Sequence, residues 1–294
     1  MMVRVGFIGL GNMGAPMASC IAAKGFELTV YDTDTARAEA LAAKIGAKAA
    51  ASPKALGEAS DVVVSMLPTG AIVKSAVLEG GLAEGLSEGA VIVDMTSSVP
   101  AVTCELVEAL KPMGIGFIDA PVSGAVPRAT DGTLSIMVGC ADPRHLEIAR
   151  PVLEAMGNRI YETGGPGTGD AMKALNNYVA AAGFAAASEA IILGKRYGLD
   201  PAKMVEIFNT STGRNFSTEM TIPNEVVQAR FASGFQLGLL AKDVHIAAEL
   251  STESGANLPL VAQTDKWWDS ALSATEGTLD HTTAYRHWEE KAGS

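Results

Sequence analysis

Cysteine, aromatic side chains and charge are all scarce in this chain of 294 residues. Its three cysteines, Cys20, Cys104 and Cys140, have neither the spacing of metal ligands nor the pairing of a disulfide framework. They predict reduced, buried thiols and a cytoplasmic protein. Only 19% of the residues are charged while 48% are apolar, which excludes a disordered chain and allows a sizeable core.

Basic residues are also few, because 22 lysines and arginines stand against 33 acidic residues, and the formal charge is −11. Without a basic run, the chain is a poor candidate for binding nucleic acid or an anionic membrane surface. The four histidines lack the spacing of metal ligands, so we expect no metal site. They are His145, His245, His281 and His287.

Long apolar runs are missing as well. The first residues pass directly into a strand pattern without a small-residue cleavage site, so a signal peptide is not expected. The most apolar later stretch, residues 178–193, contains Ser188 and Glu189 and is too short to span a membrane. The sequence therefore predicts no membrane partner.

The beginning of the chain carries a dinucleotide-binding pattern. A buried-strand run at residues 3–8 is followed by a glycine turn at 9–14, a helix pattern at 15–24 and a second strand at 27–31 that ends at Asp32. This order of strand, glycine turn, helix, strand and acid is typical of the unit that holds a pyrophosphate at a helix N-terminus.

Each glycine of the turn has its own physical task. Gly9 permits the tight turn, Gly11 lets the backbone approach a pyrophosphate, and Gly14 lets the helix pack closely on the strand. Asn12 and Met13 lie in the same turn, and we expect all five residues to contact the cofactor. An isolated glycine pattern could equally be a plain loop, but the strands and the acid around this one favour the cofactor site.

Asp32 lies 18 residues after Gly14, at the tip of the second strand. A carboxylate there accepts hydrogen bonds from ribose hydroxyls and repels a 2′-phosphate. Thr33, Asp34 and Thr35 provide no arginine that could hold such a phosphate. The sequence therefore predicts NAD as the cofactor, with NADP as the weaker option. The alternative for Asp32 itself is a solvated turn acid.

Three further strand patterns end in residues that suit a ligand-binding edge. Since the ligand of an open parallel sheet lies across the carboxyl ends of its strands, Leu67, Pro68 and Thr96 are candidate cofactor contacts. Ser123 and Gly124 follow the third strand and could bind a carboxylate through O–H and N–H donors. Each has the alternative of an ordinary turn residue. The three strand patterns occupy residues 61–67, 90–95 and 116–120.

The pattern becomes helical after the glycine-rich residues 163–167. Before them lie a strand at 133–140, a helix at 143–156 and a last strand at 159–162, and after them a long alanine-rich helix at 168–196. We predict an α/β protein with two domains. A Rossmann-type, doubly wound parallel sheet in residues 1–163 binds the dinucleotide, and an all-α domain in residues 164–294 serves substrate binding and oligomer contacts.

The long helix carries Lys173 just after the glycines, and Asn177 lies four residues later on the same face. We predict that Lys173 transfers a proton and that Asn177 helps to hold the substrate. Taken alone, a lysine on a helix is ordinarily a solvated surface charge. Lys242, in the helix pattern at 235–253, has the same alternative of an ordinary helix-face charge.

Four motifs in this order resemble the β-hydroxyacid dehydrogenases, the family of 3-hydroxyisobutyrate dehydrogenase and tartronate semialdehyde reductase. The resemblance covers nearly the whole chain. The motifs are the glycine turn and helix start at 9–18, Asp-Ala-Pro-Val-Ser-Gly at 119–124, the glycines, lysine and paired asparagines at 167–177, and Lys242-Asp243.

The resemblance implies a Rossmann domain, an all-helical domain with homodimer or homotetramer contacts, and NAD(P)-dependent oxidation of a small, anionic 3-hydroxy acid. It implies that Lys173 is the general acid/base, that Ser123, Gly124 and Asn177 bind the substrate, and that Lys242 reaches both substrate and cofactor. Many members have a second glycine where this chain has Ala125, which would change the fit of the substrate.

In this reaction a hydride leaves the carbinol carbon and the protein takes the hydroxyl proton. Lys173 can take it only if its pKa falls from about 10.4 toward the working pH. Burial and the like charge of Lys242 would lower that pKa, and an anionic substrate would raise it. Two alternatives stay open. One is an imine reductase, a class on this fold that usually lacks the lysine. The other is a catalytically idle dinucleotide-binding protein.

Overall fold

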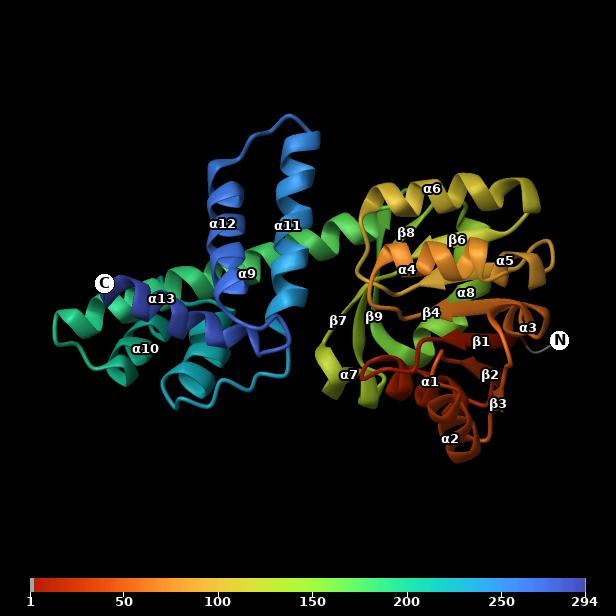
Figure 1. Cartoon of the computed structure of the whole chain (residues 1–294), viewed down its shortest axis with the longest axis horizontal. Helices are drawn as coiled ribbons and strands as arrows, with labels where there is room; N and C mark the ends of the chain where they lie inside the picture. The colour runs from red at the N-terminus through yellow and green to blue at the C-terminus, as the bar shows by residue number, and fades with distance from the viewer. Residues whose placement is uncertain (1–2, 294) are drawn as a thin grey trace. The chain divides into compact units, whose positions relative to one another are not determined.

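The computed structural model describes residues 3–293 (Figure 1). The chain folds into two compact units, Met1–Lys173 and Ala174–Ser294. The division falls within the long helix α9 (Thr168–Arg196), later in the chain than the boundary predicted between residues 163 and 164. Each unit has a hydrophobic core of its own.

The first unit is built on one nine-stranded sheet with the order β3-β2-β1-β4-β5-β6-β8-β7, and β9 pairs with β8. The pairs from β3 to β6 and the β8–β9 pair are parallel, while β8 is antiparallel to β6 and β7. The sheet is therefore parallel in its nucleotide-binding half and mixed at the other edge. The strands are β1 (Arg4–Ile8), β2 (Glu27–Tyr31), β3 (Lys48–Ala49), β4 (Val62–Ser65), β5 (Val91–Asp94), β6 (Gly116–Asp119), β7 (Val122–Ser123), β8 (Leu134–Cys140) and β9 (Gly157–Gly164).

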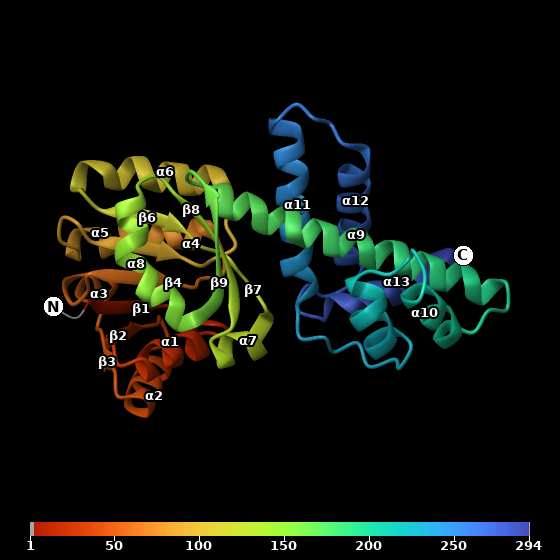
Figure 2. The same cartoon turned by 180° about the vertical axis from the view of Figure 1, so that it is seen from behind.

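Both faces of this sheet are covered by helices, as Figures 1 and 2 show. Along β4, Val62 and Val64 belong to one hydrophobic cluster and Val63 to another, because successive side chains of a strand point to opposite faces. This two-sided burial explains the continuous apolar strand runs of the sequence. The helices are α1 (Gly14–Ala23), α2 (Thr35–Ile45), α3 (Pro53–Glu58), α4 (Gly70–Lys74), α5 (Leu82–Gly85), α6 (Pro100–Leu110), α7 (Ala125–Asp131) and α8 (Pro143–Met156), with short turns η1 (Ser75–Glu79) and η2 (Lys111–Met113).

The predicted Rossmann-type fold is confirmed, and most element bounds agree within two residues. Helix α8 spans the predicted residues and is capped by Asp142, whose side chain accepts a hydrogen bond from the Arg144 N–H. Helix α7 was not expected, because it is only seven residues long and contains a proline. The expectation of three buried thiols is wrong, since Cys104 is exposed and Cys20 and Cys140 are half-buried.

The described residues of the second unit form helices joined by loops, and the helices pack around aromatic side chains. Trp268 is fully buried, and its ring lies 5.9 Å from that of Phe184 and 5.3 Å from that of Trp288. Trp268 therefore lies at the centre of the core of this unit. Besides its part of α9, the unit contains α10 (Pro201–Asn209), the π-helical η3 (Ser217–Val226), α11 (Leu237–Glu253), α12 (Pro259–Ala274), η4 (His281–Thr283) and α13 (Ala284–Gly293).

Helix α9 is 29 residues long and, by length and composition, passes the test for a membrane span, alone among the described helices. Half of its apolar window is buried inside the protein, and core helices of soluble proteins pass the same test. The extent of this helix agrees with the helix predicted at residues 168–196.

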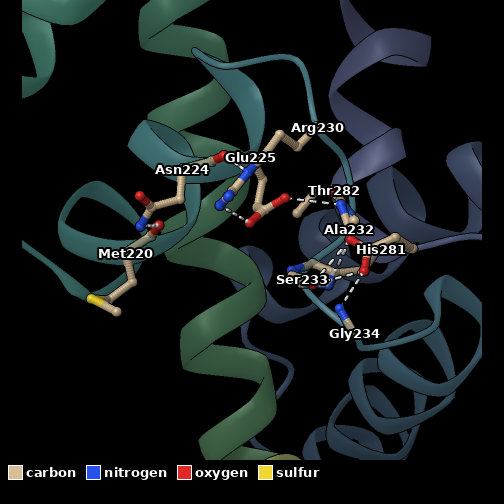
Figure 3. Close-up of polar contacts among 10 residues, drawn as sticks. Met220, Asn224, Glu225, Arg230, Ala232, Ser233, Gly234, His281 and Thr282 are labelled. Carbon is tan, nitrogen blue, oxygen red and sulfur yellow. Dashed lines mark hydrogen bonds and ion pairs between the residues drawn. The ribbon is translucent and has the colours of Figure 1, made fainter.

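A polar cluster fixes the loop between η3 and α11. The buried Glu225 carboxylate accepts hydrogen bonds from Arg230 Nη2 at 2.8 Å and from the Ala232 N–H at 2.9 Å, as Figure 3 shows. Nearby, Asp280 accepts bonds from the Ser233 hydroxyl and the Gly234 N–H. The loop backbone is therefore satisfied by two acidic side chains of the same unit.

Ser233, His281 and Asp280 of this cluster are the residue types of a catalytic triad but not its geometry. The Ser233 hydroxyl lies 3.1 Å from His281 Nδ1, and Asp280 Oδ1 lies 3.8 Å from the same nitrogen. A triad needs the serine and the carboxylate on opposite ring nitrogens. Burial lowers the pKa of His281. Its Nδ1 also contacts the Phe235 carbonyl at 3.2 Å, so the ring helps to hold the loop in place.

Candidate functional site

The glycine turn after β1 has the shape of a phosphate cradle. Gly9 has a φ of 94°, and a Cβ on Gly14 would lie 1.9 Å from the Gly9 carbonyl oxygen, so helix α1 begins in contact with the turn. A Cβ on Gly11 would meet no described atom within 4 Å. No side chain among residues 3–293 caps the N-terminus of α1, which leaves its first N–H groups for a phosphate. Asn12 is exposed, and Met13 packs partly on the core.

Asp32 is 7% exposed and is fixed by two backbone donors. The Leu10 N–H donates to its Oδ2 at 2.7 Å, and the Asp34 N–H donates to its Oδ1 at 2.9 Å. A carboxylate has about four acceptor positions, so these two backbone donors do not by themselves exhaust what Asp32 can accept. The turn and Asp32 together fit the pyrophosphate and ribose of NAD.

The structure places near Asp32 an arginine that lies outside residues 33–35. Arg37, in the first turn of α2, places its Nη1 at 3.5 Å from both oxygens of Asp32 and its Nη2 at 3.3 Å from Asp34 Oδ2. Its side chain is half exposed. The prediction rested on residues 33–35 alone, whereas the helix turns Arg37 back toward the strand end. The end of β2 therefore holds an anion and a cation side by side.

The ends of β4 and β5 are tied together beneath the expected cofactor contacts. Asp94 Oδ1 accepts hydrogen bonds from the Ser65 hydroxyl at 2.8 Å and the Thr96 N–H at 3.1 Å. Thr96 Oγ1 accepts the Leu67 N–H at 3.0 Å, while Leu67 itself is half-buried and Pro68 is exposed. Thr96 is 1% exposed, so in this structure its hydroxyl fixes the Leu67 loop. Burial raises the pKa of Asp94 to about 6.

Ser123 ends β7, and the chain turns into α7 at Gly124 and Ala125. Ser123 is half-buried, Gly124 has a φ of 139°, and Ala125 has a φ of 54°. An alanine in this left-handed region costs about 1–2 kcal/mol relative to its preferred conformations. A glycine at this position would avoid that cost. The methyl group of Ala125 therefore strains the backbone of the loop, independently of any effect on substrate binding.

Asp119, the last residue of β6, caps the helix that carries Lys173. Its Oδ1 accepts the Gly167 N–H at 2.9 Å, and its Oδ2 accepts the N–H groups of Gly169 at 2.8 Å and Asp170 at 3.1 Å. A Cβ on Gly169 would meet the Met137 carbonyl oxygen at 2.4 Å. Three of the unpaired donors at the start of α9 thus bind one carboxylate of the sheet.

Asp170 fixes the same helical turn from a second side. Its Oδ2 accepts the Thr103 hydroxyl at 2.7 Å, and its Oδ1 lies 3.4 Å from the Ser98 nitrogen. Burial, and then the neighbouring charge of Asp119, raise the pKa of Asp170 to about 8. Asp170 is therefore largely protonated at neutral pH. Lys173 is half-buried and lies three residues after Asp170 on the same helix. It therefore follows directly on the helical turn that Asp119 and Asp170 hold through hydrogen bonds.

The second unit holds the other two predicted site residues together. The Asn177 Nδ2 donates to Asp243 Oδ2 at 2.6 Å, and Lys242 Nζ lies 3.3 Å from Asp243 Oδ1. Asn177 comes from α9, and Lys242 and Asp243 come from α11. Asp243 had no predicted role, because adjacent Lys and Asp on a helix ordinarily mark a solvated face. Across residues 3–293, no group of three or more His, Cys, Asp and Glu side chains could hold a metal ion.

A Rossmann sheet with a glycine turn, an acid at the end of the second strand and a helical second unit defines an NAD(P)-binding oxidoreductase. Residues 4–165 match a family model described as the NAD binding domain of 6-phosphogluconate dehydrogenase. Residues 167–288 match one described as NAD-binding of NADP-dependent 3-hydroxyisobutyrate dehydrogenase.

The whole-chain comparisons agree with these matches. The chain is 35% identical to 2-(hydroxymethyl)glutarate dehydrogenase of Eubacterium barkeri, over 99% of this chain and 96% of that protein. It is 36% identical to mitochondrial 3-hydroxyisobutyrate dehydrogenase of Drosophila melanogaster, over 96% and 88%. A solved structure of 3-hydroxyisobutyrate dehydrogenase from Mycobacterium tuberculosis with L-serine superposes with a TM-score of 0.89 at 30% identity, covering 98% and 99% of the chains. The chain therefore belongs to the β-hydroxyacid dehydrogenase family, which uses NAD(P) to oxidise or reduce small hydroxy acids.

The two glycines of the turn should separate folding from cofactor binding. Gly14→Ala should lower the unfolding free energy of the apo protein by about 1–3 kcal/mol, because the new methyl overlaps the Gly9 carbonyl. Gly11→Ala should leave that stability nearly unchanged and weaken NAD, because its methyl enters the space that the pyrophosphate needs. Chemical denaturation and NAD titration measure the two effects. Equal stability losses for both variants would contradict the assignment.

Asp32→Ser should raise the preference for NADP over NAD, measured as the ratio of the two kcat/KM values, by at least about tenfold. The carboxylate that repels a 2′-phosphate is removed, while Arg37 stays to bind it. The double variant Asp32→Ser with Arg37→Ala is the matched control and should lose most of that gain. A gain that survives without Arg37 would show that the arginine does not contact the phosphate.

Proposed function

We propose that the protein oxidises a small 3-hydroxy acid to the corresponding 3-oxo acid, or catalyses the reverse reduction, with Lys173 as general acid/base. NAD, when bound, takes up the hydride from the carbinol carbon. Lys173 takes up the hydroxyl proton. Ser123, Gly124 and Asn177 hold the substrate carboxylate and hydroxyl. Family membership and the fit of the cofactor residues support this proposal.

The single observation that carries it is the cap formed by Asp119. One carboxylate joins the strand that leads into the Ser123-Gly124 loop to the helix turn that precedes Lys173. The proposed substrate loop and the proposed base therefore start from the same rigid point of the first unit. Such fixed placement is what a proton transfer in the transition state requires.

The roles of the cofactor residues follow the same proposal. The glycine turn, with Asn12 and Met13, binds the pyrophosphate, and Asp32 binds the adenosine ribose. Leu67 and Pro68 contact the cofactor at the edge that Thr96 fixes, and Lys242 reaches cofactor and substrate. In this proposal residues 1–163 bind the dinucleotide, and residues 164–294 add substrate and oligomer contacts.

The exact acid is to be found by a screen of 3-hydroxyisobutyrate and of glycerate-like, threonate-like and sulfonate-bearing hydroxy acids with both cofactors. Turnover of at least one acid, followed by nicotinamide absorbance, is the expected result. NAD binding without turnover of any acid would favour a catalytically idle dinucleotide-binding protein, and amine formation from cyclic imines would favour an imine reductase.

We also propose a homodimer or homotetramer in a reducing compartment such as the cytoplasm. Leu175, Val179 and Leu193 lie on one face of α9 and are 43%, 67% and 57% exposed. An apolar stripe of this length on one helix is typical of a surface that another chain covers. The three cysteines are all free thiols, which supports the compartment.

Lys173→Ala should lower kcat by about 10²–10⁴-fold, because the group that takes the proton is gone, while NAD affinity stays nearly unchanged. Nicotinamide absorbance measures turnover, and cofactor titration measures affinity. Lys195→Ala, on the same helix, is the control and should keep wild-type turnover. A Lys173→Ala enzyme with substantial kcat would reject the proton-transfer role.

Val179→Glu should reduce the molar mass in solution toward that of a monomer, because it places a charge in the middle of the apolar stripe. Light scattering after size exclusion measures the mass, and Lys195→Ala again serves as the control. If the variant keeps the mass of the wild type, or if the wild type is itself a monomer, α9 is not the subunit interface.

A further inference from the structure

A cavity of about 420 Å³ lies within the second unit and is lined by the end of α9, the start of α10, the end of η3 with the loop after it, and α13. Its apolar wall comes from Ile191, Val226, Val227 and Phe231. This volume falls in the range of small-molecule sites, which are mostly apolar with a few polar groups. Among residues 3–293, none of those proposed to contact substrate or cofactor lines it. The proposed function therefore assigns no role to this cavity.

Most of the charge on the cavity wall is compensated by neighbouring groups. Lys195 and Glu289 form an ion pair, and Glu289 also accepts the Tyr285 hydroxyl at 2.9 Å. Asp200 caps α10, where its carboxylate accepts the Lys203 N–H at 3.0 Å and lies at the positive end of the helix dipole. These groups are therefore engaged in contacts with the protein itself.

Arg286 is the charged residue of the wall that has no acidic partner in the described part of the chain. Its guanidinium lies over the Phe231 ring, 4.0 Å from the ring centroid. This stacking uses the flat face of the guanidinium, whereas its N–H groups point outward in the plane. A planar carboxylate can therefore accept two of these N–H groups while the ring keeps the guanidinium in place.

The aromatic ring of this stack belongs to a strained loop. Phe231 has a φ of 52° and Ala229 a φ of 53°, in the left-handed region that side chains rarely adopt. The carboxylate of the buried Glu225 fixes the loop by accepting the Ala232 N–H at 2.9 Å (Figure 3). Strained backbone persists only where its surroundings hold it, and it is frequent at ligand sites. The Phe231 ring is therefore a fixed wall of the cavity.

We propose that this cavity is a binding site for a small carboxylate with an apolar body, such as an arylalkanoate or a short fatty acid. The N–H groups of Arg286 hold its carboxylate, and its apolar body lies against Phe231, Ile191, Val226 and Val227. The guanidinium selects an anion, and the apolar wall selects against a strongly hydrated one such as phosphate. The proposal does not depend on the proposed function, since it uses no residue of the substrate or cofactor site.

Three probes separate the contribution of charge from that of apolar surface. Phenylacetate carries both, phenylacetamide keeps the ring without the charge, and acetate keeps the charge without the ring. Isothermal titration of the full chain should show that phenylacetate binds at least about tenfold more tightly than either of the other two. Equal affinity for phenylacetate and phenylacetamide would overturn the proposal, as would the absence of phenylacetate binding at millimolar concentration.

Arg286→Gln should weaken phenylacetate binding at least about tenfold and leave phenylacetamide binding unchanged, because only the carboxylate needs the guanidinium. Arg144→Gln, at an exposed arginine of the first unit, is the control and should leave both affinities unchanged. Arg286 is itself exposed, so both variants should keep the wild-type unfolding temperature. If Arg286→Gln does not fold, Arg286→Lys decides, because it keeps the charge, loses the planar fork and should weaken phenylacetate at least about threefold. Unchanged phenylacetate affinity in the variant that decides would reject the role of Arg286.

The substrate loop is also proposed to bind a carboxylate, so the experiment must distinguish the two sites. Ser123→Ala should leave phenylacetate affinity unchanged. A phenylacetate affinity that falls in Ser123→Ala and persists in Arg286→Gln would assign the probe to the substrate loop and overturn the proposal. A protein that turns over no hydroxy acid but binds phenylacetate through Arg286 would reject the proposed function and support the cavity as a site.

Discussion

The carboxylate of Asp119 at the N-terminus of α9 is the contact on which the arrangement of the first unit depends. A helix start leaves four N–H groups without partners, and here three backbone groups at that start donate to one side chain of a strand end. The attachment is tight because Gly169 brings the backbone against Met137 of β8 and against Asp119, while Gly167 brings it against Pro100 of α6. Since β6 leads into the Ser123-Gly124 loop and α9 leads to Lys173, one acid sets the starting point of both.

The same attachment brings several acidic side chains together in a buried region that is shielded from water. Asp94, Asp119 and Asp170 are all buried, and burial raises the pKa of each. The helix dipole and the backbone donors stabilise the charge of Asp119, whereas Asp170, with a pKa of about 8, largely keeps its proton at neutral pH. The second unit repeats this device with Asp243, which holds an amide and an ammonium. In both units a buried acid orders the groups that are proposed to touch the ligand.

The cofactor edge could be predicted largely from sequence because its signal is local. The glycine turn, the strand before it and Asp32 after it lie within 30 residues, and each has a steric or electrostatic reason that holds in any Rossmann unit. Arg37 was missed because its approach to Asp32 depends on the turn of helix α2. The antiparallel edge at β8 was missed because alternation of strands and helices says nothing of strand direction.

The sequence by itself determined the class of fold, the helical second half and the identity of the candidate groups, since hydrophobic periodicity, glycines and the lysine–asparagine spacing are properties of short segments. Only the tertiary structure decided which acids become buried, which donors they bind, and how Asn177 is oriented. Asp119 lies 48 residues before Gly167, and Asn177 lies 66 residues before Asp243. No local pattern encodes such pairs, because they form only when distant segments pack and water is excluded from between them.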